Sequence, residues 1–199
     1  MAATRLTIDM LATQPRREAR HLEGRSRGDL IGPWGRHLDA RFGADAAARV
    51  KRRAGLEQLP ETLTAHDWLP VHVQLVLTEA IADEFLDGDI RRLYPLIVAD
   101  ARTSMGRVSL AILRTLGAKR ALRLAPSTFR KVHERGNCAC EVTRDYTRIT
   151  FAGAPLFTHP TWRLLQLFAT QSLLALAETP GSVWGEDSEP DGFVTVVEH

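Results

Sequence analysis

Residues 137–178, NCACEVTRDYTRITFAGAPLFTHPTWRLLQLFATQSLLALAE, contain the pattern that decides the fold class. The alternation within 137–143 and 146–151, around the Arg144-Asp145 turn, predicts a β-hairpin. From Pro160 to Glu178 the apolar residues instead recur at helical spacing and cover most of the circumference, which predicts a long core helix that ends at Thr179-Pro180-Gly181. A final strand is expected within 192–198, after an acidic loop at 185–191.

The residues before the hairpin show helical rather than strand periodicity. Amphipathic patterns predict helices that begin after Asp45, after Pro70, at Asp89, at Ser104 and at Ser127, and a short piece lies within 118–124. A helical N-terminal part, a hairpin, a long helix and a last strand together predict the α+β class. The expected core is a small antiparallel sheet with helices packed on it.

The chain length of 199 residues fits one domain, with residues 1–30 as a flexible or loosely docked basic arm and residues 31–199 as a single α+β domain. Cys138 and Cys140 are too few and too close in sequence to form a disulfide framework, which fits a reducing compartment. The N-terminus has no apolar run typical of a signal peptide, so we expect a cytoplasmic protein that does not associate with membranes.

Charge is distributed in blocks, although the net charge is only +2. Residues 1–60 carry a net +5, residues 61–100 a net −6, residues 101–150 a net +8 and residues 151–199 a net −5. Alternating blocks of this kind predict distinct positive and negative surfaces, which favours a protein partner or a homodimer.

Motifs for catalysis or metal binding are missing from the sequence. Nucleophile-elbow, zinc-protease, P-loop and dinucleotide signatures are absent, so we expect no enzymatic activity. His133, Cys138, Cys140 and His159 could supply zinc ligands by type, but their spacing matches no common zinc pattern, and no metal site is predicted. Structural roles are the simpler interpretation of these residues.

Residues 118–136 imitate a helix-turn-helix, with the hairpin as a wing. A basic patch for phosphate contacts would consist of Arg120, Arg123, Arg130, Lys131 and Arg135. The second helix offers no Asn or Gln to read adenine edges, which weakens the interpretation as a DNA-binding regulator. The simpler alternative is that Arg107, Arg114, Lys119, Arg120, Arg123 and Arg130 form the solvent-exposed side of core helices, with Met105, Val108, Ile112, Leu116 and Leu122 facing inward.

Several short motifs recur in a recognisable order from about Gly55 to His199. They are Phe85-Leu86-Asp87-Gly88-Asp89, Ser104-Met105-Gly106-Arg107, Leu116-Gly117 and Gly136-Asn137, followed by the hairpin, the long helix and the last strand. In these features the chain resembles a bacterial family of unknown function, expanded in certain soil bacteria, whose members resemble the fold shared by heme-NO-binding, 4-vinyl-reductase-like and TRAPP-subunit domains.

The resemblance implies a compact α/β sandwich that cradles a small apolar molecule or forms a dimer surface. It carries over no catalytic residue, and we expect no cofactor. His72 and His133 would be the candidate axial ligands of a heme, but the Tyr-x-Ser-x-Arg signature of the heme domains is absent.

Our first hypothesis is therefore a non-enzymatic sensory, regulatory or protein-interaction domain. A small apolar ligand would lie between the long helix and the sheet, lined by Phe151, Trp162, Leu165 and Phe168. A fully packed core at those four residues is the alternative. A DNA-binding regulator that uses residues 118–136 is the second hypothesis for function.

Overall fold

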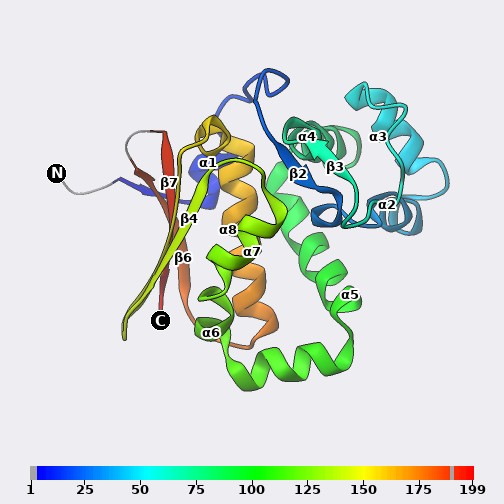
Figure 1. Cartoon of the computed structure of the whole chain (residues 1–199). Coiled ribbons are helices and arrows are strands. Elements are labelled where there is room, and N and C mark those ends of the chain that lie inside the picture. The colour runs from blue at the N-terminus through cyan, green and yellow to red at the C-terminus, as the bar shows by residue number, and fades with distance from the viewer. Residues whose placement is uncertain (1–3, 189–190) are drawn as a thin grey trace.

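The computed structural model describes residues 4–188 and 191–199. It is of the α+β class, as predicted, with one five-stranded antiparallel sheet in the order β1-β6-β7-β5-β4 and a two-stranded sheet, β2-β3. Figure 1 shows the large sheet on one side of the molecule, α8 beside it, and a helical part with α2, α3 and α4 on the far side. The strands are β1 (Arg5–Leu6), β2 (Arg25–Arg27), β3 (Trp68–Pro70), β4 (Asn137–Val142), β5 (Tyr146–Ala152), β6 (Ser182–Ser188) and β7 (Gly192–Glu198).

The predicted hairpin is confirmed, because β4 and β5 pair antiparallel with Asn137 opposite Ala152 and Val142 opposite Thr147. The predicted last strand is also present as β7, and it lies at the centre of the sheet between β5 and β6. The expected acidic loop at 185–191 is wrong for residues 185–188, which belong to the unpredicted strand β6, and residues 189 and 190 lie outside the described part. Pairing with β7 along its whole length stabilises this polar strand.

Helix α8 (Pro160–Leu176) is the core helix that the sequence predicts, and it packs on the sheet through β6 and β7 and on α5 from the other side. Trp162, Leu167 and Phe168 are almost completely buried, and Trp162 meets the ring of Phe151 edge-on, with centroids 5.0 Å apart. The remaining helices are α1 (Ile8–Ala12), α2 (Trp34–Phe42), α3 (Ala46–Ala54), α4 (His72–Phe85), α5 (Leu93–Leu116), α6 (Ala118–Leu122) and α7 (Ala125–Val132).

Residues 4–30, predicted as a flexible or loosely docked arm, form β1, α1 and β2 in the structure. Leu6, Leu11, Ala19 and Leu22 of this segment are buried in the main hydrophobic core. Burial of that many apolar side chains ties the segment to the domain. A second, smaller core holds α2, α3 and α4 together around Trp34, Val50 and Leu77.

Helix α5 is interrupted at Gly106, whose backbone (φ 68°, ψ 165°) is not helical. We call residues 93–105 the inner half of α5 and residues 107–116 its outer half. Residues other than glycine almost never adopt this backbone conformation, so Gly106 permits the change of direction seen at the bottom of Figure 1. The two helical segments expected here, Asp89 to Thr103 and Ser104 to Leu116, are therefore present as the two halves of α5, with the change of direction at Gly106.

Candidate functional site

A cavity of about 880 Å³ lies between the helical part and the sheet part of the molecule. Its walls come from α2 and α4 on one side, from the inner half of α5, and from α7, β5 and α8 on the other side. Apolar side chains predominate, including Leu77, Ile81, Leu96, Ile97 and Leu173. The volume is within the range of small-molecule sites, roughly 300–1,000 Å³.

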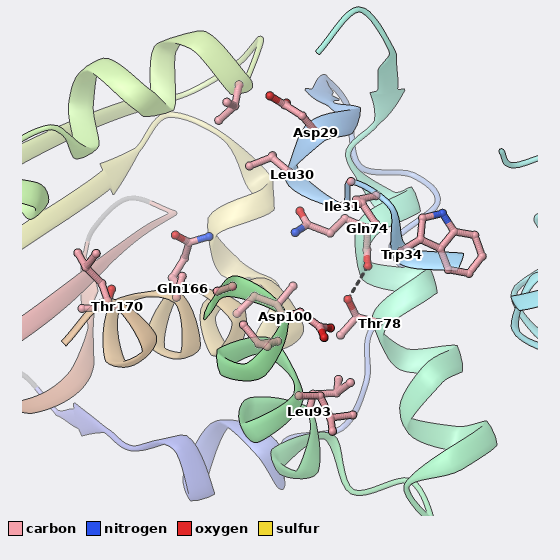
Figure 2. Close-up of a pocket in the computed structure, with 18 of the residues that line it drawn as sticks. Asp29, Leu30, Ile31, Trp34, Gln74, Thr78, Leu93, Asp100, Gln166 and Thr170 are labelled. Carbon is pink, nitrogen blue, oxygen red and sulfur yellow. Dashed lines mark hydrogen bonds between the residues drawn. The ribbon is translucent and has the colours of Figure 1, made fainter. Parts of the chain in front are cut away.

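Two amide side chains face each other across this cavity. Gln74 projects from α4 and Gln166 from α8, and Figure 2 shows their amide groups pointing toward one another. Each is partly exposed, and neither amide has a hydrogen-bond partner among residues 4–188 and 191–199. The backbone of Gln74 is held in place, since the Thr78 hydroxyl donates to its carbonyl oxygen at 2.7 Å. Both amides are thus free to donate and to accept.

The charged residues of the cavity wall are paired with one another or with a neighbour. Asp100 of α5 accepts a hydrogen bond from Nη2 of Arg41 at 3.1 Å, and Nδ1 of His37 lies 3.5 Å from the same oxygen. Asp29 forms an ion pair with the guanidinium of Arg27, whose Nε donates to Oδ1 at 3.0 Å. That ion pair raises the pKa of Arg27. The wall therefore offers little uncompensated charge.

His133 lies where α7 ends and belongs to the cavity wall. Its Nδ1 shares a 2.8 Å hydrogen bond with the Oγ of Ser26, which is buried on β2. Its ring packs on Phe129, with centroids 4.5 Å apart. Burial lowers the pKa of His133 to about 4, so the imidazole is neutral at neutral pH. The pairing connects β2 to α7 across the back of the cavity.

Of the four pocket residues that the sequence proposes, the structure places Phe151 and Leu165 in the cavity wall. Trp162 and Phe168 are not among the lining residues, because both are buried in the core between α8 and the sheet. The sequence analysis did not identify Gln74, Gln166 or the group formed by Asp100, Arg41 and His37 as residues of the site. Two polar residues on otherwise apolar faces of α4 and α8 were the available signal.

The five cations of the proposed basic patch are all exposed. Arg135 forms an ion pair with Glu23, and the carbonyl oxygen of Lys131 accepts from Arg27 at 3.4 Å. The supporting helices are short, with five residues in α6 and eight in α7, and Phe129 and Val132 anchor α7 to the core. Whether Arg120, Arg123 and Arg130 contact DNA stays a prediction.

The two cysteines lie on strand β4. Cys138 and Cys140 are half-buried on one face of β4, and burial raises the pKa of the Cys138 thiol to about 12. Across residues 4–188 and 191–199 the structure has no group of three or more His, Cys, Asp or Glu side chains placed to hold a metal ion. None of the described helices is both long and apolar enough to cross a membrane.

Comparison by sequence finds no matching family model and no matching curated protein. Comparison by structure finds H-NOX domains. One is a point mutant of an H-NOX protein from K. algicida in the unliganded Fe(II) state, with a TM-score of 0.59 and 11% identity over 87% of this chain and 96% of that chain. Another comes from work on heme distortion in the H-NOX family (TM-score 0.58, 10% identity, 86% of this chain and 93% of that chain).

A third similar structure is the oxygen complex of an oxygen-binding H-NOX domain related to soluble guanylate cyclases (TM-score 0.53, 9% identity, 86% of this chain and 93% of that chain). The likeness covers both the helical part and the sheet part of the molecule, since it extends over most of each chain. The rest of the family resemblance inferred from the sequence stays a prediction. This chain has the fold of the H-NOX domains.

Proposed function

We propose that this protein is a non-enzymatic sensory or regulatory domain that binds a small, uncharged and largely apolar molecule in the cavity between α4, α5, α7 and α8. The observation that carries the proposal is the cavity of about 880 Å³ with apolar walls and two unpaired amides, Gln74 and Gln166. Burial of apolar ligand surface would supply the affinity, and the amides would orient one polar group of the ligand.

The balance of charge favours a neutral ligand. Asp29 and Asp100 already hold their cations, Arg27 and Arg41, so the wall offers neither a free cation for an anionic ligand nor a free carboxylate for a cationic one. A charged ligand would leave water without recovering its lost solvation, which is costly. An uncharged ligand with one hydrogen-bonding group matches the amides instead.

The likeness to H-NOX domains raises the question of heme, and the residues of this cavity do not fit that group. His133 has a neutral imidazole suited to bind iron. The two carboxylates of a heme, however, need cations, and Arg41 is the only arginine or lysine among the described lining residues. It is already bound to Asp100, and Asp29 adds a second carboxylate to the wall. We therefore assign no part of the function to heme.

A catalytic role for the Ser26–His133 pair is not favoured by its surroundings. Ser26 is buried, and its hydroxyl meets Nδ1 of the imidazole. Burial is the only cause of the lowered pKa of His133, and within the described residues no carboxylate forms a hydrogen bond or ion pair with the ring. A Ser-His nucleophile needs both access to substrate and an acid that orients the imidazole. The pair acts as a structural connection in this proposal.

Native mass spectrometry and thermal-shift screening with uncharged apolar compounds test the proposal. Ala169 of α8 lines the cavity. The substitution Ala169→Phe should fill part of the cavity and lower the affinity for any ligand of the wild type by more than ten-fold. Ala175→Phe is the matched control, because Ala175 is also an exposed alanine of α8 but does not line the cavity. Equal binding by both variants, or no thermal shift with any compound, would contradict the proposal.

DNA binding remains the second candidate because Arg120, Arg123 and Arg130 are exposed beside the hairpin. Fluorescence anisotropy with duplex DNA at 50 and 200 mM salt would test it. Affinity that falls steeply with salt, and that Arg123→Ala and Arg130→Ala reduce, would support the candidate. Absence of binding at 50 mM salt would eliminate it.

A further inference from the structure

The two amides of the cavity wall set a requirement for any molecule that lies between them. Gln74 and Gln166 belong to walls that are otherwise mainly apolar, and their amide groups point toward one another (Figure 2). Within residues 4–188 and 191–199 neither amide is satisfied by the protein. An amide that loses water without gaining a partner lowers affinity by about ten-fold or more. A bound molecule must therefore offer hydrogen-bonding groups to both amides.

The positions of the two amides are set by helices that are anchored in the core. Leu75, next to Gln74 on α4, and Leu167, next to Gln166 on α8, are completely buried. Side chains that project from rigid, packed elements hold the geometry of a site better than side chains on loops. The cavity therefore presents two carboxamides from opposite walls at defined places.

Few small polar groups can satisfy two carboxamides at once. A hydroxyl has one hydrogen to donate, and a ketone has none, so neither pairs fully with the donors and acceptors of both amides. In a lactam or imide, a ring N–H lies beside a ring carbonyl. That edge matches one carboxamide through two parallel hydrogen bonds, and its carbonyl oxygen has a second lone pair for the N–H of the other carboxamide.

Aromatic side chains of the same cavity fit a flat ring. Phe129 of α7 and Phe151 of β5 both line it, with ring centroids 5.8 Å apart and planes tilted by 55°. The imidazole of His133 packs beside Phe129. Aromatic rings pack favourably against the faces and edges of other flat rings. Since the charges of Asp29 and Asp100 are already compensated, the ring that fits is uncharged.

We propose that the cavity binds a flat, uncharged heterocycle, and that Gln74 and Gln166 hold its lactam or imide edge. This assignment rests on the proposed function and adds the chemical class of the ligand to it. Apolar burial and ring packing supply affinity, and the two amides select the N–H and carbonyl pair. Aliphatic alcohols and ketones of similar size leave at least one hydrogen-bonding atom of the amides unpaired, so they bind more weakly.

The uncharged bicyclic probes 2-quinolinone and coumarin test this proposal. They have nearly the same shape and differ only in that the ring N–H of 2-quinolinone is a ring oxygen in coumarin. In isothermal titration calorimetry with the full chain, we expect the Kd of 2-quinolinone to be lower by about ten-fold or more, because coumarin has no hydrogen to donate to an amide oxygen. Naphthalene, which has no polar group, measures binding through apolar burial alone.

The double variant Gln74→Leu with Gln166→Leu removes both amides at nearly constant side-chain size. Its preference for 2-quinolinone over coumarin should fall below about two-fold, while naphthalene should bind at least as well as it binds the wild type. Gln171→Leu is the matched control, because Gln171 also belongs to α8 but does not line the cavity. Thermal denaturation without probe would establish that each variant is folded, and the comparison of the two probes in the wild type needs no variant.

The outcomes separate this proposal from the proposed function. Equal affinity of the wild type for 2-quinolinone and coumarin, or a preference that the double variant keeps, would overturn the assignment of the lactam edge. Binding of naphthalene in that case would leave an apolar ligand of the cavity in place. Absence of binding by all three probes, together with a blank thermal-shift screen, would contradict the proposed function itself.

Discussion

The inner and outer halves of α5 have similar sequence patterns but differ in how far their apolar side chains are covered. Both repeat apolar residues at helical spacing, yet Leu93 of the inner half is buried and Ile112 of the outer half is more than half exposed. The inner half contributes Leu96, Ile97 and Asp100 to the cavity wall, whereas the outer half exposes Val108, Ile112 and Leu116, which the sequence pattern placed facing inward. The difference shows that periodicity identifies an amphipathic helix but not whether its apolar face is covered within the same molecule.

The largest expected difference between the two halves is in stability. Leu93→Ala should lower the free energy of unfolding by about 2–4 kcal/mol, because it removes a buried side chain. Ile112→Ala should change that free energy by less than about 0.5 kcal/mol, because its side chain is mostly in water. Urea denaturation measures both. A similar loss in the two variants would show that the outer half is covered in solution.

Low pH should destabilise the folded protein through His133, which lies in the cavity wall. Burial lowers the pKa of this group in the folded protein to about 4, against about 6.5 in the unfolded chain, so the unfolded chain binds more protons between these pH values. The stabilising contribution is complete above pH 6.5 and is lost as the pH falls toward 4. The wild type should therefore lose up to about 3 kcal/mol more than His133→Gln over that range. Equal pH profiles in urea denaturation would contradict the prediction.

Gly106 separates the two halves, so its substitution should show whether the break is required. Gly106→Ala should cost about 1–3 kcal/mol, because φ 68° with ψ 165° is strained for any residue with a Cβ. A new Cβ would meet no atom within 4 Å, so the loss would come from the backbone alone. Ser109→Ala, at an exposed position of the outer half, is the control and should be neutral. If thermal denaturation finds that Gly106→Ala is also neutral, the break in α5 does not require a glycine at this position.

Ion pairs should produce the smallest effects in either half. Arg41→Gln removes the cation beside Asp100 in the cavity wall, and Arg114→Gln removes the partner of Glu178 in the outer half. Each should cost about 0.2–1 kcal/mol, and the exposed Arg114 pair should be at the lower end. Both effects should shrink at 1 M salt. A larger loss in Arg114→Gln than in Arg41→Gln would mean that the outer half depends on its connection to α8.

Much of the fold could be predicted because its strongest signals are local. The hairpin at 137–152 and the helix at 160–176 match their sequence patterns closely, since alternation and helical spacing are properties of the chain itself. Strand β6 was missed, because its acidic residues resemble a loop until β7 pairs with them. The two residues of β1 are too short to give any periodic signal.

The candidate site was predictable only in part, for the same reason. Phe151 and Leu165 could be named from the hairpin and the long helix, whose faces the sequence defines. Gln74 and Gln166 could not be paired, because 92 positions separate them and only the approach of α4 to α8 brings them across one cavity. Trp162 and Phe168 were named by hydrophobicity alone, which does not distinguish a filled core from a lined cavity.

The sequence by itself determined the α+β class, the hairpin, the central helix and the blocks of charge, because each depends on neighbouring residues. Only the tertiary structure decided that residues 4–30 dock on the domain, that a cavity opens between the helical part and the sheet part, and that the outer half of α5 leaves its apolar side in water. These features depend on which surfaces remain after distant elements have packed. Packing of that kind follows from the shapes of whole elements, which no short stretch of sequence contains.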